Sequence, residues 1–146
     1  MIEIKHVFSD APDGSRIRKM TIASGPVILK DGKVLLDKHG GDGLWKFPGG
    51  KLRDDESPRQ TAVREAKEEL GIDVTLVGDP LFFLFEHEHE GVPEIVVLIH
   101  YLATYTGEIV PGRDVEVWDW HDIKNLPTDC APNIKPILER AASLKP

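Results

Sequence analysis

The segment Ser57–Gly71 (SPRQTAVREAKEELG) is the most sharply bounded element of the sequence, because it carries both a helix start and a helix stop. Ser57 can cap the first turn and Gln60 can close a capping box with it, while Pro58 stands where its missing N–H does no harm. Gly71 supplies the stop. The helical period then gives one apolar stripe, formed by Ala62, Val63, Ala66 and Leu70. We therefore expect an amphipathic helix packed on another layer of structure.

Apolar runs bounded by turn residues predict strands on both sides of this helix. Gly25–Leu36 holds two such runs around Asp31-Gly32, a pair suited to a two-residue hairpin turn. A short apolar piece, Leu44–Phe47, precedes the breaker Pro48-Gly49-Gly50. Further strands are predicted over Val74–Val77, Leu81–Glu88, Ile95–Tyr105 and Val115–Trp120.

A second helix is predicted from about Asn133, with one apolar stripe formed by Ile134, Ile137, Leu138 and Ala141. Strands outnumber helices, which favours an α/β fold in which helices pack on the faces of a mixed sheet. A chain of 146 residues without repeats or linker-like segments is typical of one domain, so we expect residues 1–146 to fold as a single unit.

Composition and charge exclude several classes of protein. A formal net charge of −7 opposes a broad grip on long nucleic acids. The apolar runs, such as Ile95–Ile99, are far shorter than the roughly 20 residues of a membrane helix. The single cysteine, Cys130, excludes an internal disulfide and favours a reducing, cytoplasmic setting. A small anionic partner is compatible with the charge if a divalent cation reverses the local field, and a homodimer is left open.

Glu65, Glu68 and Glu69 share a band beside the apolar stripe of the first helix, with Glu69 closest to the buried side. Arg64 and Lys67 point elsewhere on the same wheel. One interpretation of this band is an ordinary solvated face. The local energetics count against that interpretation, because like charges three or four residues apart cost roughly 0.2 to 0.5 kcal/mol per pair. The helix dipole adds about 0.3 to 1 kcal/mol against anions in the last turn.

A hard cation would remove this conflict. Magnesium prefers oxygen ligands and usually keeps waters and substrate phosphates in its shell. Three carboxylates beside a glycine-rich loop, whose carbonyls can approach closely, make half of such a cage. The sequence therefore predicts a metal site whose open side admits a phosphate.

The stretch from Gly50 to Ile72 resembles the signature of the Nudix hydrolases. That signature reads Gly, five residues, Glu, seven residues, then Arg-Glu-aliphatic-any-Glu-Glu-any-Gly-aliphatic. It is met without a gap by Gly50, Glu56 and 64–72, with Ala66 at the first aliphatic position. The lead-in WKFPG at 45–49 is also similar. The resemblance implies an α/β/α sandwich with a mixed central sheet, and hydrolysis of a phosphoanhydride in a nucleoside diphosphate linked to another group.

The resemblance also implies roles for individual residues, with Mg²⁺ or Mn²⁺ as the cofactor. The expected metal ligands are the Gly49 carbonyl, Glu65, Glu68 and Glu69. The expected catalytic group is Glu56, Arg64, Glu68 and Glu69. In that group Arg64 holds the carboxylates by ion pairing, and Glu56 supports the site or a second metal. Glu69 or a downstream glutamate would act as general base, and that assignment is left open.

Candidates also lie outside the signature. Glu116 precedes a predicted strand in the region from which family members often supply an extra metal ligand. Lys38, with His39 beside it, could pair with phosphate, as could Arg53 in the loop of the signature itself, and Trp45 could stack on a nucleobase. For each of these a solvated or packing role is the simpler alternative. The acidic tip Phe85–Glu94, with His87 and His89 on one strand face, raises the alternative of a second metal site.

Two other functions compete with hydrolysis. A non-catalytic nucleotide-binding or regulatory module of the same fold is one, and the intact signature counts against it. Isopentenyl diphosphate isomerase is the other, but it needs a catalytic cysteine and Cys130 lies in a terminal, loop-like region. The proline that would indicate ADP-ribose is replaced by Glu86, and His89 stands near the tyrosine of diadenosine polyphosphate enzymes. Nucleoside triphosphates and ADP-sugars both remain open as substrates.

Overall fold

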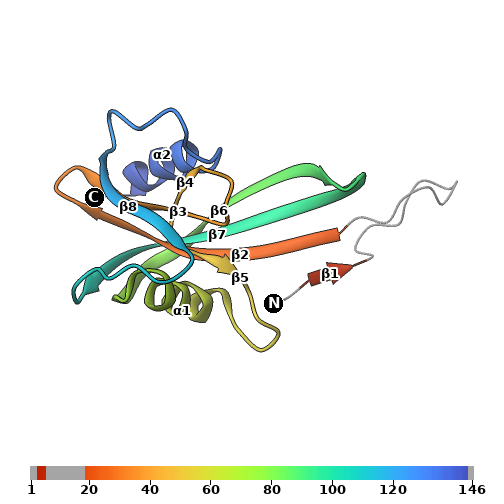
Figure 1. Ribbon diagram of the computed structural model, residues 1–146, viewed down its shortest axis with the longest axis horizontal. Helices are drawn as coiled ribbons and strands as arrows, with labels where there is room; N and C mark the ends of the chain where they lie inside the picture. Colours follow the sequence, from red (N-terminus) through yellow and green to blue (C-terminus); the bar gives the residue numbers. More distant parts are fainter. Residues whose placement is uncertain (1–2, 6–18, 145–146) are drawn as a thin grey trace, which may run out of the picture.

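The computed structural model describes residues 3–5 and 19–144, which form strands and two helices (Figure 1). The strands are β1 (Glu3–Lys5), β2 (Lys19–Lys30), β3 (Lys33–His39), β4 (Trp45–Lys46), β5 (Gly50–Lys51), β6 (Asp73–His89), β7 (Val92–Thr106) and β8 (Val115–Asp122). The helices are α1 (Pro58–Leu70) and α2 (Ile134–Leu144). Neither of these described helices is long and apolar enough to cross a membrane.

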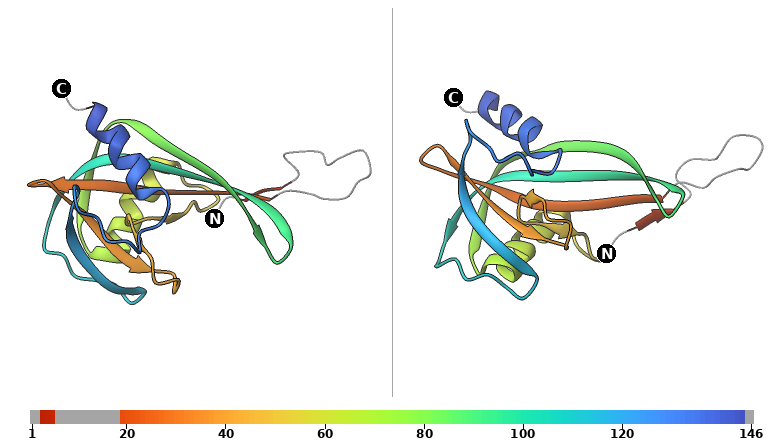
Figure 2. Two further views of the ribbon diagram at one scale, coloured as in Figure 1. Left: turned by 90° about the horizontal axis from the view of Figure 1, so that it is seen from above. Right: turned by 45° about the horizontal axis from the view of Figure 1, so that its top comes forward.

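The strands form a mixed sheet in the order β4, β3, β2, β7, β6, with β8 paired to β3 and with β1 and β5 paired to β2. Residues 19–28 of β2 run parallel to residues 94–103 of β7. The other pairs are antiparallel. Figure 2 shows β6, β7 and β2 running side by side, and α1 and α2 lie on opposite sides of them. The predicted α/β/α sandwich is confirmed.

The strands β2 and β3 are apolar on both faces because a helix covers each face. Val27 packs in the cluster around α2, whereas the next residue, Ile28, packs in the cluster around α1. On β3, Val34 and Leu36 belong to the α2 side and Leu35 to the α1 side. Since successive side chains of a strand point to opposite faces, burial on both sides explains the nearly continuous apolar run at 25–36.

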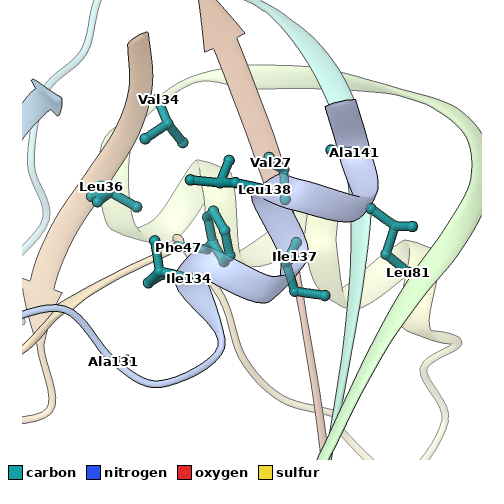
Figure 3. Packing of buried hydrophobic residues seen from close by; sticks show 10 residues of the cluster. All are labelled: Val27, Val34, Leu36, Phe47, Leu81, Ala131, Ile134, Ile137, Leu138 and Ala141. Atoms are coloured by element: carbon teal, nitrogen blue, oxygen red, sulfur yellow. The ribbon is translucent and has the colours of Figure 1, made fainter. Parts of the chain in front are cut away.

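The helix α2 covers its face of the sheet through the predicted stripe, whose four members are all buried. Figure 3 shows this helix against the buried side chains of Val27, Val34, Leu36, Phe47 and Leu81. The prediction of an apolar stripe from Ile134 onward is therefore confirmed. Asn133 stands immediately before the first turn of α2 and is buried.

The helix α1 begins and ends as predicted. The Ser57 hydroxyl accepts a hydrogen bond from the Gln60 backbone N–H at 3.1 Å, and the Gln60 side-chain oxygen accepts one from the Ser57 N–H at 2.8 Å. Gly71 adopts the left-handed conformation, with φ of 69°, and its N–H bonds to the Lys67 carbonyl. These contacts satisfy backbone groups that the helix itself leaves unpaired.

The buried face of α1 differs from the predicted stripe at one position. Ala62, Ala66 and Leu70 are fully buried, but Val63 is 41% exposed, so its prediction as a core residue is wrong. Thr61 and Glu69 are buried instead. The buried arc is centred between Ala62 and Glu69 on the helical wheel, which leaves Val63 just beyond its edge.

One strand boundary also needs correction. Val74–Val77 and Leu81–Glu88 were predicted as separate strands, but both belong to β6. The register of β6 against β7 shifts between Val77 and Leu81, and Gly78 has φ of 77°. The extra residues are therefore absorbed as a bulge rather than a turn. The predicted hairpin turn between β2 and β3 is confirmed, with positive φ at Asp31 and Gly32.

Candidate active site

The loop that contains Gly49 and Gly50, here called the glycine loop, leads into α1 and lies directly against the acidic side of that helix. A Cβ atom at Gly50 would stand 2.5 Å from Oε1 of Glu65, so only glycine allows this approach. The Gly49 N–H points at both oxygens of the Glu69 carboxyl, at 3.3 and 3.4 Å. The pairing of β5 with β2 holds the loop in this place. Gly50 is thus favoured by its close packing on the Glu65 carboxylate, whereas a Cβ atom at Gly49 would stand 2.7 Å from the Ser24 carbonyl oxygen of β2.

Arg64 joins three carboxylates of the site. Its guanidinium donates to Glu56 at 2.5 and 2.9 Å, to Oε1 of Glu65 at 2.9 Å and to Oε2 of Glu68 at 3.0 Å. The wheel direction predicted for Arg64, away from the carboxylates, is therefore wrong, because the long side chain curls back along the helix surface. The ion pairing implied by the family resemblance is present.

Glu56 is the best-anchored carboxylate of this group. The hydrogen bond from Arg64 is the largest cause that lowers the pKa of Glu56 to about 2, and the Thr61 hydroxyl and Arg53 N–H also donate to it. The same contacts raise the pKa of Arg64 further above its ordinary value. Glu56 and Arg64 are therefore a permanently charged pair that braces the loop against α1.

Glu69 has a different environment, because it is only 8% exposed and its hydrogen bonds and ion pairs with the described residues involve no arginine. Its carboxyl lies 3.5 Å from Nδ1 of His39, which also contacts the fully buried carboxylate of Asp37. Burial first, then Asp37 and Glu65, raise the pKa of Glu69 well above its ordinary range. Without a cation the Glu69 carboxyl is therefore expected to hold a proton at neutral pH.

A cavity of about 480 Å³ opens over these groups. It is lined by His39, Gly40, Gly41, Gly49, Glu65, Glu68, Glu69, Arg113, Asp114 and Val115. Asp37 lies behind it with one oxygen, Oδ2, that has no hydrogen-bond partner within the described residues. Carboxylate oxygens around a cavity, one of them unsatisfied, are the donor set that Mg²⁺ or Mn²⁺ requires. The residues present fit such an ion, which Glu65, Glu68 and Glu69 would hold.

Asp37, His39 and Glu69 form a second grouping of potential ligands. Each offers one ligand atom, and these atoms lie within 4.8 Å of one another. Asp37 was not identified in the sequence, although a signal exists. It stands two residues after Leu35, on the α1-facing side, and directly follows the apolar run at 34–36. A carboxylate at a buried strand position is informative because burial of an unpaired charge is costly.

A second cavity, of about 400 Å³, adjoins the first and shares His39 and Gly49 with it. Its apolar lining includes Leu44, Phe47, Phe85 and Leu98, and its polar lining includes Asp42, Lys46, His100 and Asn133. The sequence predicted none of these residues as binding residues, because they come from separate segments that only the fold brings together.

The other predicted site residues lie in less direct positions. Lys38 pairs with Asp129 at 2.9 Å and stands 5.1 Å from the Trp45 ring centroid. Trp45 packs edge-on against His121, and neither Lys38 nor Trp45 lines either cavity, so the geometry does not support substrate contacts for them. Arg53 donates to Oε1 of Glu68 at 3.1 Å, at the rim of the acidic cavity.

Glu116 and the acidic hairpin tip also lie apart from the cavity lining. The Glu116 side chain is exposed on β8, one residue beyond the lining residue Val115, and its role as a ligand stays a prediction. His87 pairs with Glu94 at 2.9 Å, and the His89 side chain lies outside the described residues. Among the side chains that the structure describes, no group of three candidate ligands forms at this tip.

Comparison with known proteins agrees with this geometry. The 8-oxo-dGTP diphosphatase of Proteus vulgaris is 48% identical over 63 residues, which cover 40% of this chain and 55% of that protein. The CTP pyrophosphohydrolase of Escherichia coli (strain K12) is 42% identical over 107 residues, covering 70% of this chain and 62% of that protein. The match thus spans less than two thirds of the length of either relative.

The fold comparison and the family model agree with each other. The solution structure of the E. coli ORF135 protein has a TM-score of 0.69 and 32% identity, covering 86% of this chain and 90% of that chain. The family model described as the NUDIX domain matches residues 19–141, which include both cavities, the glycine loop and α1. The chain therefore belongs to the NUDIX family.

Proposed function

We propose that the protein is a Mg²⁺-dependent nucleotide pyrophosphohydrolase, with nucleoside triphosphates as its substrates. The observation that carries this proposal is the pair of joined cavities, one acidic and one largely apolar, which meet at His39 and Gly49. A polyphosphate chain held by a cation suits the first, and a nucleobase suits the second. The names of the two relatives, a CTP pyrophosphohydrolase and an 8-oxo-dGTP diphosphatase, support the same substrate class.

In the proposed reaction, water attacks one phosphorus atom and the phosphoanhydride bond breaks, which gives a nucleoside monophosphate and pyrophosphate. A divalent cation supplies charge neutralisation on the diphosphate and a more acidic bound water. Glu65, Glu68 and Glu69 would hold that cation, and Arg64 keeps Glu65 and Glu68 in place through its fork of hydrogen bonds. Arg113 lines the acidic cavity and Lys46 lines the second cavity, so each can place a positive charge near the phosphates.

Glu69 must lose its proton before its carboxylate can hold a cation. Loading of the site with Mg²⁺ is thus expected to release a proton and to strengthen as the pH rises. Glu69 stands between the glycine loop and His39, so it can exchange a proton with the imidazole or with solvent in the cavity. The identity of the general base is left open between Glu69 and a downstream glutamate such as Glu116.

The test is incubation with Mg²⁺ and a panel of nucleoside triphosphates, 8-oxo-dGTP, ADP-ribose and diadenosine polyphosphates, with separation of the nucleotide products. We expect a nucleoside monophosphate and pyrophosphate from at least one triphosphate. A Glu69→Gln preparation, purified in parallel, is the control for contaminating phosphatases. Turnover of ADP-ribose alone would favour the ADP-sugar alternative, and binding without turnover of any compound would favour a non-catalytic module.

The setting of this activity is part of the proposal. A single half-buried thiol, Cys130, suits a reducing cytoplasm, and a small nucleotide suits a chain whose net charge is −7. We expect residues 1–146 to act as a single domain. A homodimer would show as twice the chain mass in light scattering.

A further inference from the structure

His100 and Asn133 form a buried hydrogen-bonded pair in the second cavity. His100 lies on β7 and is 5% exposed, and Asn133 directly precedes α2 and is 6% exposed. His100 Nδ1 lies 3.1 Å from the Gly25 carbonyl oxygen, and Nε2 lies 3.0 Å from Asn133 Nδ2. The Phe47 ring packs against the imidazole, with 4.7 Å between the ring centroids. The imidazole is therefore fixed on three sides.

These contacts determine where the imidazole proton lies. A carbonyl oxygen can only accept, so Nδ1 must carry the hydrogen that bonds to Gly25. Burial lowers the pKa of His100 to about 4, which keeps the ring neutral at physiological pH. Nε2 is then left with a lone pair, and it can only accept from its partner. The group that meets it must be the NH₂ of Asn133 and not the amide oxygen.

The orientation of the Asn133 amide follows from this pairing. An isolated asparagine amide can turn over at little cost, since its oxygen and nitrogen are similar in size. Here the reversed orientation would place the amide oxygen against the lone pair of Nε2. Pro136 at the third position of α2 offers the amide oxygen no N–H, and within residues 3–5 and 19–144 no hydrogen bond to this oxygen is found. A nearly buried acceptor is thus held ready on the wall of the cavity.

We propose that His100 is a positioning residue that fixes the Asn133 amide so that its oxygen accepts a hydrogen bond from an amino group of the substrate base. Resting on the proposed nucleotide substrate, this assigns the second cavity to bases of the cytosine and adenine type. Cytosine and adenine present an amino donor next to a ring-nitrogen acceptor, whereas uracil and hypoxanthine present an oxo acceptor next to a ring N–H. An amide that turns freely would pair with both kinds of base edge, whereas the fixed amide pairs with the edge of cytosine or adenine.

The experiment compares two pairs of triphosphates that differ only in this group, CTP against UTP and ATP against ITP. We expect kcat/KM of the protein to favour the amino member of each pair by about 10- to 100-fold, the range for a misread base edge. Equal turnover of both members, or a preference for the oxo member, would overturn the assignment. If none of the four compounds is hydrolysed, the proposed function fails as well, so the two failures are distinguishable.

Two variants at position 100 separate positioning from simple packing. His100→Phe keeps a ring against Phe47 but removes both hydrogen bonds. His100→Gln can pair with either orientation of the Asn133 amide, so it restores a partner without restoring direction. Both variants should bring the amino-to-oxo ratio toward one, mainly through KM. A loss of stability alone would lower turnover of both members of a pair equally, and a ratio that persists in His100→Gln would refute the role.

A measurement on the wild-type protein does not depend on activity or on variants. Long-range ¹H–¹⁵N correlation spectra report which imidazole nitrogen carries the proton. At neutral pH we expect His100 to be neutral and protonated at Nδ1. A charged ring, or a neutral ring protonated at Nε2, would remove the reason for a fixed amide and would overturn the proposal.

Discussion

Glu69→Gln tests the buried carboxyl of the site most directly. Burial, Asp37 and Glu65 raise the pKa of Glu69 well above its ordinary value of 4.5. The folded metal-free protein therefore keeps a proton on Glu69 that the unfolded chain releases once the pH exceeds that value. Because the unfolded state then binds fewer protons than the folded state, the free energy of unfolding falls as the pH rises.

The size of this effect follows from the transfer of one proton. The slope is about 1.4 kcal/mol per pH unit, or roughly 2.7 kcal/mol between about pH 5.5 and 7.5. Glutamine has nearly the same shape and no titrating proton, so the variant lacks this term. The stability of Glu69→Gln relative to the wild type should therefore grow by that amount over the interval. The titrating groups that lie away from Glu69 cancel in the difference.

The assay is urea unfolding in EDTA, followed by fluorescence of the three tryptophans, at several pH values. Glu68→Gln is the matched control, because Glu68 stands one residue earlier on the same helix with a side chain that is 49% exposed. Its difference from the wild type should stay nearly flat with pH. A flat difference for Glu69→Gln would refute the argument that the empty site holds a proton. With Mg²⁺ present, Glu69→Gln should lose turnover by orders of magnitude.

Three further substitutions probe the same site. Arg64→Gln should lower the free energy of unfolding by about 2 to 4 kcal/mol in urea, because it leaves Glu56 and Glu65 without their cation in a site where the arginine is 17% exposed. Glu56→Gln should weaken the fall in the free energy of unfolding at acid pH. The pKa of Glu56 is about 2, so in the wild type its stabilising charge is lost as the pH falls from 4.5 toward that value. Acid unfolding followed by circular dichroism measures this difference. Gly50→Ala should lower kcat/KM about 100-fold with little change in melting temperature, because the new methyl group must displace the Glu65 carboxylate.

The helix α1 illustrates how far local sequence rules reach. Its capping box, its left-handed stop and the burial of Glu69 beside the apolar stripe all followed from residue types and the helical period. The exposure of Val63 did not, because the width of the buried arc depends on what packs against the helix. The reach of Arg64 back over the carboxylates did not follow either, since a wheel gives the direction of Cβ and not of a long side chain.

The parts of the site that come from other segments were beyond such rules. Asp37 and His39 reach Glu69 only because β3 lies in the sheet beneath α1. The polar pair in the second cavity depends on β7, the turn before α2 and the Gly25 carbonyl of β2 meeting at one point. Each of these contacts joins residues thirty or more positions apart, and no periodicity within one element reports such a meeting.

The structure also changes the reason for which a cation is needed. Repulsion among the three glutamates of α1 predicted one, but Arg64 already pairs with Glu65 and Glu68 without any metal, and Arg53 also pairs with Glu68. The electrostatic conflict that remains is the repulsion between the carboxylates of Glu69 and the buried Asp37. Arg64 thus lets the folded site exist without metal, with a proton on Glu69. A divalent cation would then compete with that proton, so metal affinity, as well as the stability of the metal-free fold, is expected to depend on pH.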